Sequence, residues 1–467
     1  MLGRGVVTMR VRRNVYGLPA GDDTLLWYGR AVAAMKQLPS SNPRGWEYQA
    51  AIHGLDADVP DDLTSYWAQC QHGSSFFLPW HRMYLLHFER IVATQIKALG
   101  GPADWALPYW DYSSDPAWRA LPPAFRGHTL ADGSRNPLFV AERRNAANSG
   151  ARFLDERDVD LEDALTADPD TDGFFGGEQA GHTSGEFGQL ELTVHNRIHG
   201  RVGGLMGNPD FAALDPIFWL HHANIDRLWE VWLARDPGHH NLTTRFWLRG
   251  VSFDFHGDDG QPVSMRTTDV LDLTAPALDY SYEDLSDPLA IPAAVAGLSE
   301  AMPPPKQFEL VGATLSPVVL DDQVRHAVLP TPVTPQAFAD DTAPAGLVAG
   351  PPSPLVQKVT LKLEHVTSTA HSPTYDVYLN VPDAAAPSSH EDRFVGRATM
   401  FGVVQASDPR GPHAGSGQDF AFDITDIYRQ LSDAGQVDPQ NLRVSFVPVD
   451  PEPGTKVSVG RISLYFA

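Results

Sequence analysis

Two groups of histidines dominate the chemistry that this sequence could perform. Each group has three members, and the six residues are His53, His72 and His81 in the first group and His195, His199 and His222 in the second. His195 and His199 are four positions apart, a spacing that puts both imidazoles on one face of a helix. Because neutral imidazole is a common metal ligand, each group is predicted to bind one metal ion.

The histidines alone do not name the metal, since imidazole suits copper, zinc, iron and nickel. A catalytic zinc site most often contains a His-x-x-x-His segment with a general-base glutamate between the two histidines. Positions 196 to 198 are Asn, Arg and Ile, so that base is missing. The sequence therefore argues against a zinc hydrolase.

The segments around the histidines resemble those of type-3 copper proteins of the tyrosinase, catechol oxidase and polyphenol oxidase family. Three segments carry the resemblance, namely 77–89, 195–199 and 215–227. It extends from about Val11 to about Asp284 and ends near Tyr280-Ser281-Tyr282, which is similar to the Tyr-x-Tyr segment that closes the catalytic domain of that family. The resemblance implies two copper ions, each held by three histidines, with dioxygen as co-substrate.

The resemblance assigns His53, His72 and His81 to copper A and His195, His199 and His222 to copper B. His53 is assigned on its spacing and on the aromatic-rich segment 46–52 that precedes it. His221 points about 100° away from His222 around a helix, so it is expected to support a ligand rather than to be one.

The single cysteine, Cys70, stands two residues before the predicted ligand His72. A free cysteine is often only a small buried hydrophobic residue. In the fungal and molluscan branches of the family, however, a Cys-x-His at this place is joined by a thioether bond between the sulfur and the histidine ring. The resemblance therefore implies a thioether between Cys70 and His72, which would fix the ring of the ligand.

Hydroxylation of a monophenol needs a base that takes the phenol proton. Glu191, four residues before His195, resembles in its spacing the glutamate that holds a water in the plant enzymes, and Asn196 is the partner that such a water would use in the tyrosinases. Glu186 has the spacing seen in some bacterial relatives and is the competing candidate. Both carboxylates could instead be solvated surface groups.

Two further residues near His222 have expected roles. Phe218, four residues before it, matches the aromatic residue that packs over the dicopper centre in the family, although a plain core phenylalanine would look the same. Asp226, one turn after His222, could accept a hydrogen bond from a ligand or from a neighbouring arginine, or form an ordinary surface ion pair with Arg227.

Length, charge and hydropathy limit the classes of partner. A chain of 467 residues suggests more than one domain, and a net charge of −23 argues against nucleic acid or an anionic membrane surface as partner. The sequence has no apolar run of about eighteen residues, so no membrane span is expected. The N-terminus lacks the apolar region of a signal peptide, so a cytoplasmic location is expected, with export on a partner protein as the alternative.

The periodicity of apolar residues changes once along the chain. Up to about residue 235 it is helical, and from about residue 307 it alternates as in strands. We expect an α+β multidomain protein, with a mainly α-helical dicopper bundle domain over 1–284, a Pro/Ala-rich linker over 285–306 and a C-terminal β-sandwich domain over 307–467. The proline-rich segment 326–354 is expected to leave the sandwich as an excursion.

The second domain resembles the C-terminal β domain of plant polyphenol oxidases and hemocyanin units. That resemblance implies an inhibitory lid whose plug enters the copper site, and segment 400–404 is the candidate for it, with a buried strand as the alternative. The leading prediction is a latent oxidase that hydroxylates monophenols to o-diphenols and oxidises o-diphenols to o-quinones. The alternatives are a catechol oxidase without monophenolase activity and a hemocyanin-like oxygen carrier.

Overall fold

The computed structural model of the protein describes residues 9–130, 132–169, 173–177, 187–289, 309–330, 358–369, 373–382, 386–410, 415–437, 441–451 and 453–467. The chain separates into two compact units, Met1–Ala296 and Gly297–Ala467, and the division falls inside the segment expected to be a linker. Most of that segment, together with Glu186, lies outside the described residues. None of the helices in the described ranges is long and apolar enough to cross a membrane.

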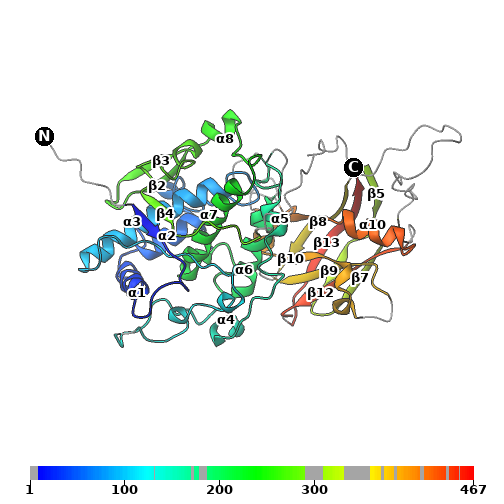
Figure 1. Ribbon diagram of the computed structural model, residues 1–467, viewed down its shortest axis with the longest axis horizontal. Helices are drawn as coiled ribbons and strands as arrows, with labels where there is room; N and C mark the ends of the chain where they lie inside the picture. The colour runs from blue at the N-terminus through cyan, green and yellow to red at the C-terminus, as the bar shows by residue number, and fades with distance from the viewer. Residues whose placement is uncertain are drawn as a thin grey trace. The chain divides into compact units, whose positions relative to one another are not determined.

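The first unit is mainly helical (Figure 1). Its α-helices are α1 (Thr24–Met35), α2 (Trp46–His53), α3 (Phe77–Ala98), α4 (Asn145–Ser149), α5 (Glu162–Leu165), α6 (Asn196–Val202), α7 (Ile217–Arg235) and α8 (Arg245–Arg249). A π-helical turn, η4 (Glu191–His195), leads directly into α6. The 3-10 turns are η1 (Asp61–Leu63), η2 (Pro116–Trp118), η3 (Pro123–Phe125), η5 (Ala212–Leu214) and η6 (Thr267–Asp269).

Helices α3 and α7 form the frame of this unit. Every residue of α3 from Phe77 to Glu89 is buried, because other elements pack around the whole first half of the helix. Pro79 is the third residue of α3, where a backbone N–H has no partner within the helix, so the proline does not break it. Helix α7 begins at Ile217, which places His222 in its second turn rather than at a helix start.

Short strands complete the first unit. β1 (Arg10–Arg12) pairs in parallel with β4 (Tyr280–Tyr282), so the two ends of the unit lie side by side. β2 (Phe253–His256) and β3 (Pro262–Met265) form an antiparallel hairpin. The β2 side chain of Phe255 stacks on His87 of α3, with ring centroids 5.4 Å apart, and the hairpin thereby covers that helix.

The second unit contains two antiparallel sheets, which confirms the α+β fold class with a sheet-rich C-terminal part. Strand order is β10-β9-β12-β7 in one sheet and β11-β8-β13-β5 in the other, with β6 also paired to β13. The strands are β5 (Glu309–Ala313), β6 (Val318–Leu320), β7 (Arg325–Leu329), β8 (Val359–Ser368), β9 (Thr374–Leu379), β10 (Phe394–Thr399), β11 (Gln418–Asp423), β12 (Leu442–Val449) and β13 (Val457–Phe466). Short helical segments accompany them, namely η7 (Pro387–Ser389), η8 (Glu391–Arg393), α9 (Val403–Ala406) and α10 (Thr425–Asp433).

Strand β12 illustrates why these residues form a sheet. Leu442, Val444 and Phe446 are fully buried and alternate along the strand, as a strand with one face in a core requires. The expected excursion over 326–354 is wrong at its start, because His326 lies in β7 and pairs with Ser445 of β12. Met400 and Phe401, the candidate plug, follow β10 and are buried; their role stays a prediction.

Candidate metal centre

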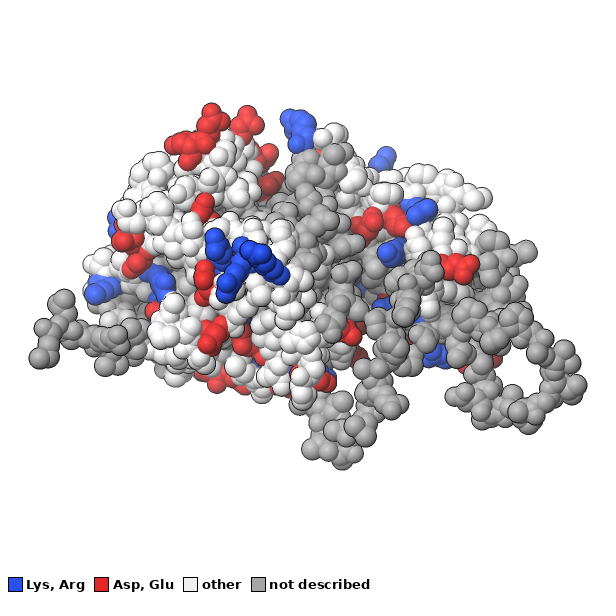
Figure 2. Space-filling view, turned by 90° about the horizontal axis from the view of Figure 1, so that it is seen from above, with Lys and Arg blue, Asp and Glu red and all other residues white. Residues whose placement is uncertain are grey.

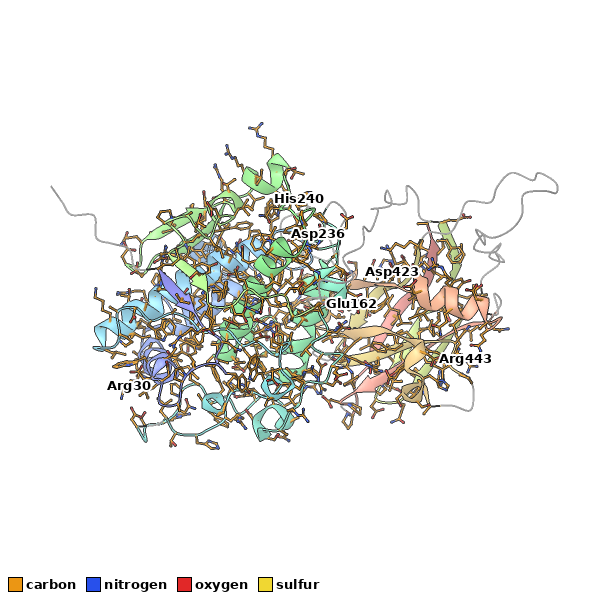
Figure 3. The ribbon with its side chains drawn as sticks, viewed as in Figure 1. Arg30, Glu162, Asp236, His240, Asp423 and Arg443 are labelled. Atoms are coloured by element: carbon orange, nitrogen blue, oxygen red, sulfur yellow. The ribbon has the colours of Figure 1, made fainter. Side chains whose placement is uncertain are left out.

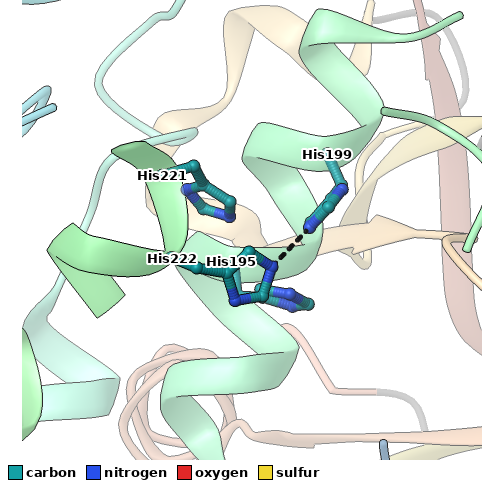
Figure 4. Close-up of side chains that lie close together, drawn as sticks. All are labelled: His195, His199, His221 and His222. Carbon is teal, nitrogen blue, oxygen red and sulfur yellow. Dashed lines mark hydrogen bonds between the residues drawn. The ribbon is translucent and has the colours of Figure 1, made fainter. Parts of the chain in front are cut away.

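Four histidines from η4, α6 and α7 lie together, namely the three of the second group and His221 (Figure 4). They are His195, His199, His221 and His222; all are buried, and one ring nitrogen of each lies within 4.8 Å of the others. His199 Nε2 and His222 Nε2 approach to 3.3 Å. Two ring nitrogens this close together can bind one metal ion.

The first group comes from α2, the loop before α3, and α3 itself. His53, Cys70 and His72 each offer an atom within 4.8 Å of the others. The ring of His81 lies 5.7 Å from that of His53 and 5.5 Å from that of His72, and it stacks on His222 at 4.5 Å. The six histidines predicted from the sequence are therefore brought together in one buried cluster, while their roles as ligands stay predictions.

Backbone carbonyls orient several of these rings. The Nδ1 atoms of His53, His81 and His199 lie 2.9, 2.8 and 2.7 Å from the carbonyl oxygens of Pro209, Phe77 and Met206. Because a carbonyl oxygen only accepts, each Nδ1 carries the hydrogen, and Nε2 keeps its lone pair. This is how metal-binding histidines are commonly fixed in proteins.

The protonation state of the cluster also suits a metal. Burial lowers the pKa of His195, His199 and His222 well below the usual range. Neutral imidazoles that keep a lone pair on one ring nitrogen form a donor set that fits copper. The residues present therefore agree with the metal that the sequence resemblance implies.

Phenylalanine rings pack against histidines of both groups. Phe218 is fully buried, and its ring centroid lies 5.0 Å from that of His53 and 4.1 Å from that of His222. Phe77 packs against His81 at 4.6 Å and His195 at 4.7 Å. The sequence singled out Phe218 but not Phe77, whose position one helical turn before His81 was the available signal.

Glu191 lies beside the loop of the first group. It is 1% exposed, and its two carboxylate oxygens accept the backbone N–H of Gly73 at 3.0 and 3.1 Å. Burial raises the pKa of its carboxyl group well above the usual range. Glu191 thus links η4 to the residue that follows His72, a contact that the sequence did not reveal.

Asn196 lies next to the second group and holds one of its rings. Its Oδ1 atom is 2.9 Å from Nδ1 of His195. Its Nδ2 atom is buried and has no hydrogen-bond partner within the described part of the chain. Such an amide has a donor left for a water or a substrate, and its proposed role with Glu191 stays a prediction.

His221 lies beside the histidines of the second group but is held by a different partner. Its Nδ1 atom is 3.1 Å from the hydroxyl oxygen of Tyr112, and its ring stacks on that of His195 at 5.4 Å with an interplanar angle of 19°. Tyr112 was not singled out in the sequence. The stacking is consistent with the expectation that His221 supports a ligand.

Cys70 is in contact with His72. Its sulfur lies 3.7 Å from Nδ1 of His72, and the residue is 3% exposed. Burial, followed by the charges of Asp210 and Glu191, raises the pKa of the thiol. The sulfur is close enough for a crosslink to form with little movement, and the thioether stays a prediction.

Comparison with known proteins places this centre in a family. The model described as the common central domain of tyrosinase matches residues 43–153 and 136–235. A domain of unknown function matches residues 307–467. The two ranges that match the tyrosinase model together contain all six predicted ligands.

Two similar proteins have names that belong to this family. Tyrosinase HcTyr1 from Hahella sp. (strain CCB-MM4) is 36% identical over 98% of this chain and 99% of its own length. The latent form of chloroplastic polyphenol oxidase from Prunus armeniaca is 31% identical over 57% of this chain. That match covers 47% of the plant protein, so the chain spans about half the length of that relative.

Two solved structures share the fold of the whole chain. Latent aurone synthase, a polyphenol oxidase, has a TM-score of 0.65 at 21% identity and covers 98% of this chain and 90% of its own. Latent apple tyrosinase has a TM-score of 0.64 at 21% identity and covers 98% of this chain and 97% of its own. Together with the Hahella relative, which matches from end to end, the central-domain match shows that this chain belongs to the tyrosinase and polyphenol oxidase family of copper oxidases.

Proposed function

We propose that the protein uses dioxygen to hydroxylate monophenols to o-diphenols and to oxidise o-diphenols to o-quinones. The observation that carries this proposal is the meeting of six buried histidines from α2, α3, η4, α6, α7 and the loop before α3 in one cluster. The full-length relative named a tyrosinase supports it.

In this proposal the cluster holds two copper ions. His53, His72 and His81 would bind one ion, and His195, His199 and His222 the other. Copper bound there would supply the activation of dioxygen. The chain itself fixes the tautomers of His53, His81 and His199 through the carbonyl contacts, so that Nδ1 carries the hydrogen and Nε2 the lone pair that a metal would need.

Glu191 and Asn196 are the proposed proton-handling residues. An ionised Glu191 takes the phenol proton, directly or through a water that also accepts the free Nδ2–H of Asn196. The raised pKa of the buried carboxyl makes it a stronger base once ionised. Phe218 and Phe77 wall the cluster with aromatic rings, which exclude water and favour a flat aromatic substrate.

The second unit is proposed to keep the enzyme latent. Latent aurone synthase and latent apple tyrosinase, two solved structures that share the fold of the whole chain, are named as latent. The segment expected to be a linker, 285–306, contains the boundary between the two compact units. Separation of the second unit from the first by a cut in this segment should then raise the oxidase activity.

Oxygen uptake by copper-loaded protein tests this function. The intact chain and a chain cut within 285–306 would each receive a monophenol with a trace of diphenol. We expect slow uptake by the intact chain and sustained uptake after the cut. Uptake with diphenol alone would identify a catechol oxidase, and reversible dioxygen binding without uptake would identify an oxygen carrier.

A further inference from the structure

A pocket on the surface of the first unit lies outside the histidine cluster. It has a volume of about 440 Å³ and is lined by Arg249, Ser252, Ser264, Arg266, Thr268 and Asp269. Arg249 ends α8, Ser264 belongs to β3, and Thr268 and Asp269 belong to η6; Ser252 lies between α8 and β2, and Arg266 between β3 and η6. The lining therefore combines residues from several separate segments of the chain.

The two arginines of the pocket are exposed cations on a strongly acidic protein. The whole chain carries a net charge of −23, and acidic side chains such as Asp236 and Asp423 project from its surface (Figure 3). Figure 2 looks onto the side on which α8 lies in Figure 1, and it shows Lys and Arg side chains gathered there in one compact group. One compact group of positive charge therefore lies on the face that carries α8, with acidic side chains around it.

No acidic side chain pairs with either arginine among the residues that the structure describes. Asp269 lines the pocket, but its Oδ2 atom accepts the backbone N–H of Arg266 at 2.8 Å. Asp254 accepts the hydroxyl of Ser264. Two guanidinium groups against one lining carboxylate leave the pocket with an excess of positive charge.

Helix α8, which ends at the pocket, is held by contacts of its aromatic side chains. Trp247 of α8 is fully buried and donates its indole N–H to the carbonyl oxygen of Ser75 at 2.8 Å. Phe246 packs edge-on against Phe76, with ring centroids 5.7 Å apart. Helix α8 is therefore anchored to the residues before α3, which holds the backbone of Arg249 in place.

We propose that this pocket binds a tetrahedral oxyanion, a phosphate or sulfate group. Guanidinium groups bind such groups with two parallel hydrogen bonds, and the hydroxyl of Thr268 in the lining can donate another. A pocket of this volume also has room for a small molecule that carries the anion.

Calorimetric titration of the full-length copper protein with inorganic phosphate at low ionic strength tests the proposal. We expect saturable binding of one equivalent, weakened by about tenfold or more in Arg249→Gln and in Arg266→Gln. Arg245→Gln is the matched control, because Arg245 is exposed on the same helix and does not line the pocket. Its affinity should stay close to that of the wild type.

Three results would overturn the proposal. One is the absence of saturable binding to the wild-type protein. Another is binding that neither pocket variant weakens, since the phosphate would then occupy a different place, such as the metal centre. The third is an equal loss in Arg245→Gln, which would show a general attraction to positive charge. Unchanged thermal unfolding of all three variants would show that each is folded.

Discussion

Arg82 of α3 donates its Nε–H to Asp226 of α7 at 2.5 Å, and both side chains are buried. Arg82 directly follows His81, and Asp226 lies one turn after His222. The pair therefore joins the two helices that carry histidines of the two groups. The expectation that Asp226 accepts from an arginine is confirmed, but its partner is Arg82 rather than Arg227 at the surface.

Asp226 is the centre of a wider buried network. Its Oδ2 atom accepts from Tyr280 at 2.7 Å, from Tyr282 at 2.6 Å and from Arg12 at 3.2 Å. Burial acts to raise the pKa of Asp226, but the charges of Arg82 and Arg12 outweigh it, and the pKa is lowered. The network ties β1 and β4 to the helices that carry the histidines.

Asp226→Asn should therefore destabilise the protein strongly. Removing one partner of a buried ion pair leaves a buried charge uncompensated and costs about 3–5 kcal/mol. The free energy of unfolding from denaturant titration measures the effect. Glu230→Gln is the control, because Glu230 also accepts from Arg82, at 2.7 Å, but is partly exposed. Equal losses in the free energy of unfolding of the two variants would show that Asp226 stabilises the protein no more than the partly exposed Glu230 does.

Glu191→Gln should separate the two activities. The amide keeps an oxygen that accepts the N–H of Gly73, so the fold should persist. Loss of the base should lower monophenol hydroxylation by about a hundredfold and leave diphenol oxidation within a fewfold. In the wild type, hydroxylation should rise with pH as the carboxyl with its raised pKa ionises, and this rise should vanish in the variant.

The control for Glu191→Gln is Glu156→Gln at an exposed position. An equal fall of both activities in Glu191→Gln would mean that Glu191 positions the loop after His72 and does not act as a base. An unchanged monophenolase rate would leave the proton transfer to another group.

Cys70 should be found joined to His72 in protein that has turned over with copper and dioxygen. Formation of the thioether removes one hydrogen from the thiol and one from the ring, and dioxygen takes up the two electrons. Mass spectrometry of the peptide that contains both residues should show the loss of two hydrogens. A full-mass peptide with a free thiol would contradict the crosslink.

The buried His87 should make stability fall in acid. Burial, followed by the charge of Arg90, lowers its pKa to about 4, whereas an unfolded histidine titrates near 6.5. Between these values the unfolded chain binds the extra proton, so stability is lost as pH falls from about 6.5 through about 4. The loss from this group is at most about 3 kcal/mol.

His87→Phe should remove that part of the pH dependence. The measurement compares the free energy of unfolding of metal-free protein at pH 7 and near pH 4, with His240→Phe, at an exposed position, as control. A wild-type slope that persists unchanged in His87→Phe would show that other groups cause the acid sensitivity.

The sequence predicted the helices and strands in which apolar residues recur at a clear period. Helices α3 and α7 and strands β8, β12 and β13 follow from spacing of apolar residues. Strands β10 and β11 were not predicted, because β10 contains Gly396 and Arg397 and β11 begins and ends with polar residues, so neither has a clear apolar pattern in the sequence.

In the site, the histidines were found because each stands in a distinctive segment. The contact between Glu191 and Gly73 and that between Tyr112 and His221 join residues 118 and 109 positions apart. Only the folded chain brings such pairs together, so spacing along one sequence does not reveal them.

Copper content tests the central claim, that the histidine cluster is a dicopper centre, most directly. Purified protein loaded with copper and dialysed against a weak chelator would be analysed for copper by mass spectrometry, beside His81→Ala, His199→Ala and the exposed control His128→Ala. We predict two copper ions per chain in the wild type and the control, and at most one in each cluster variant. One ion or none in the wild type, or no loss in the cluster variants, would contradict the account.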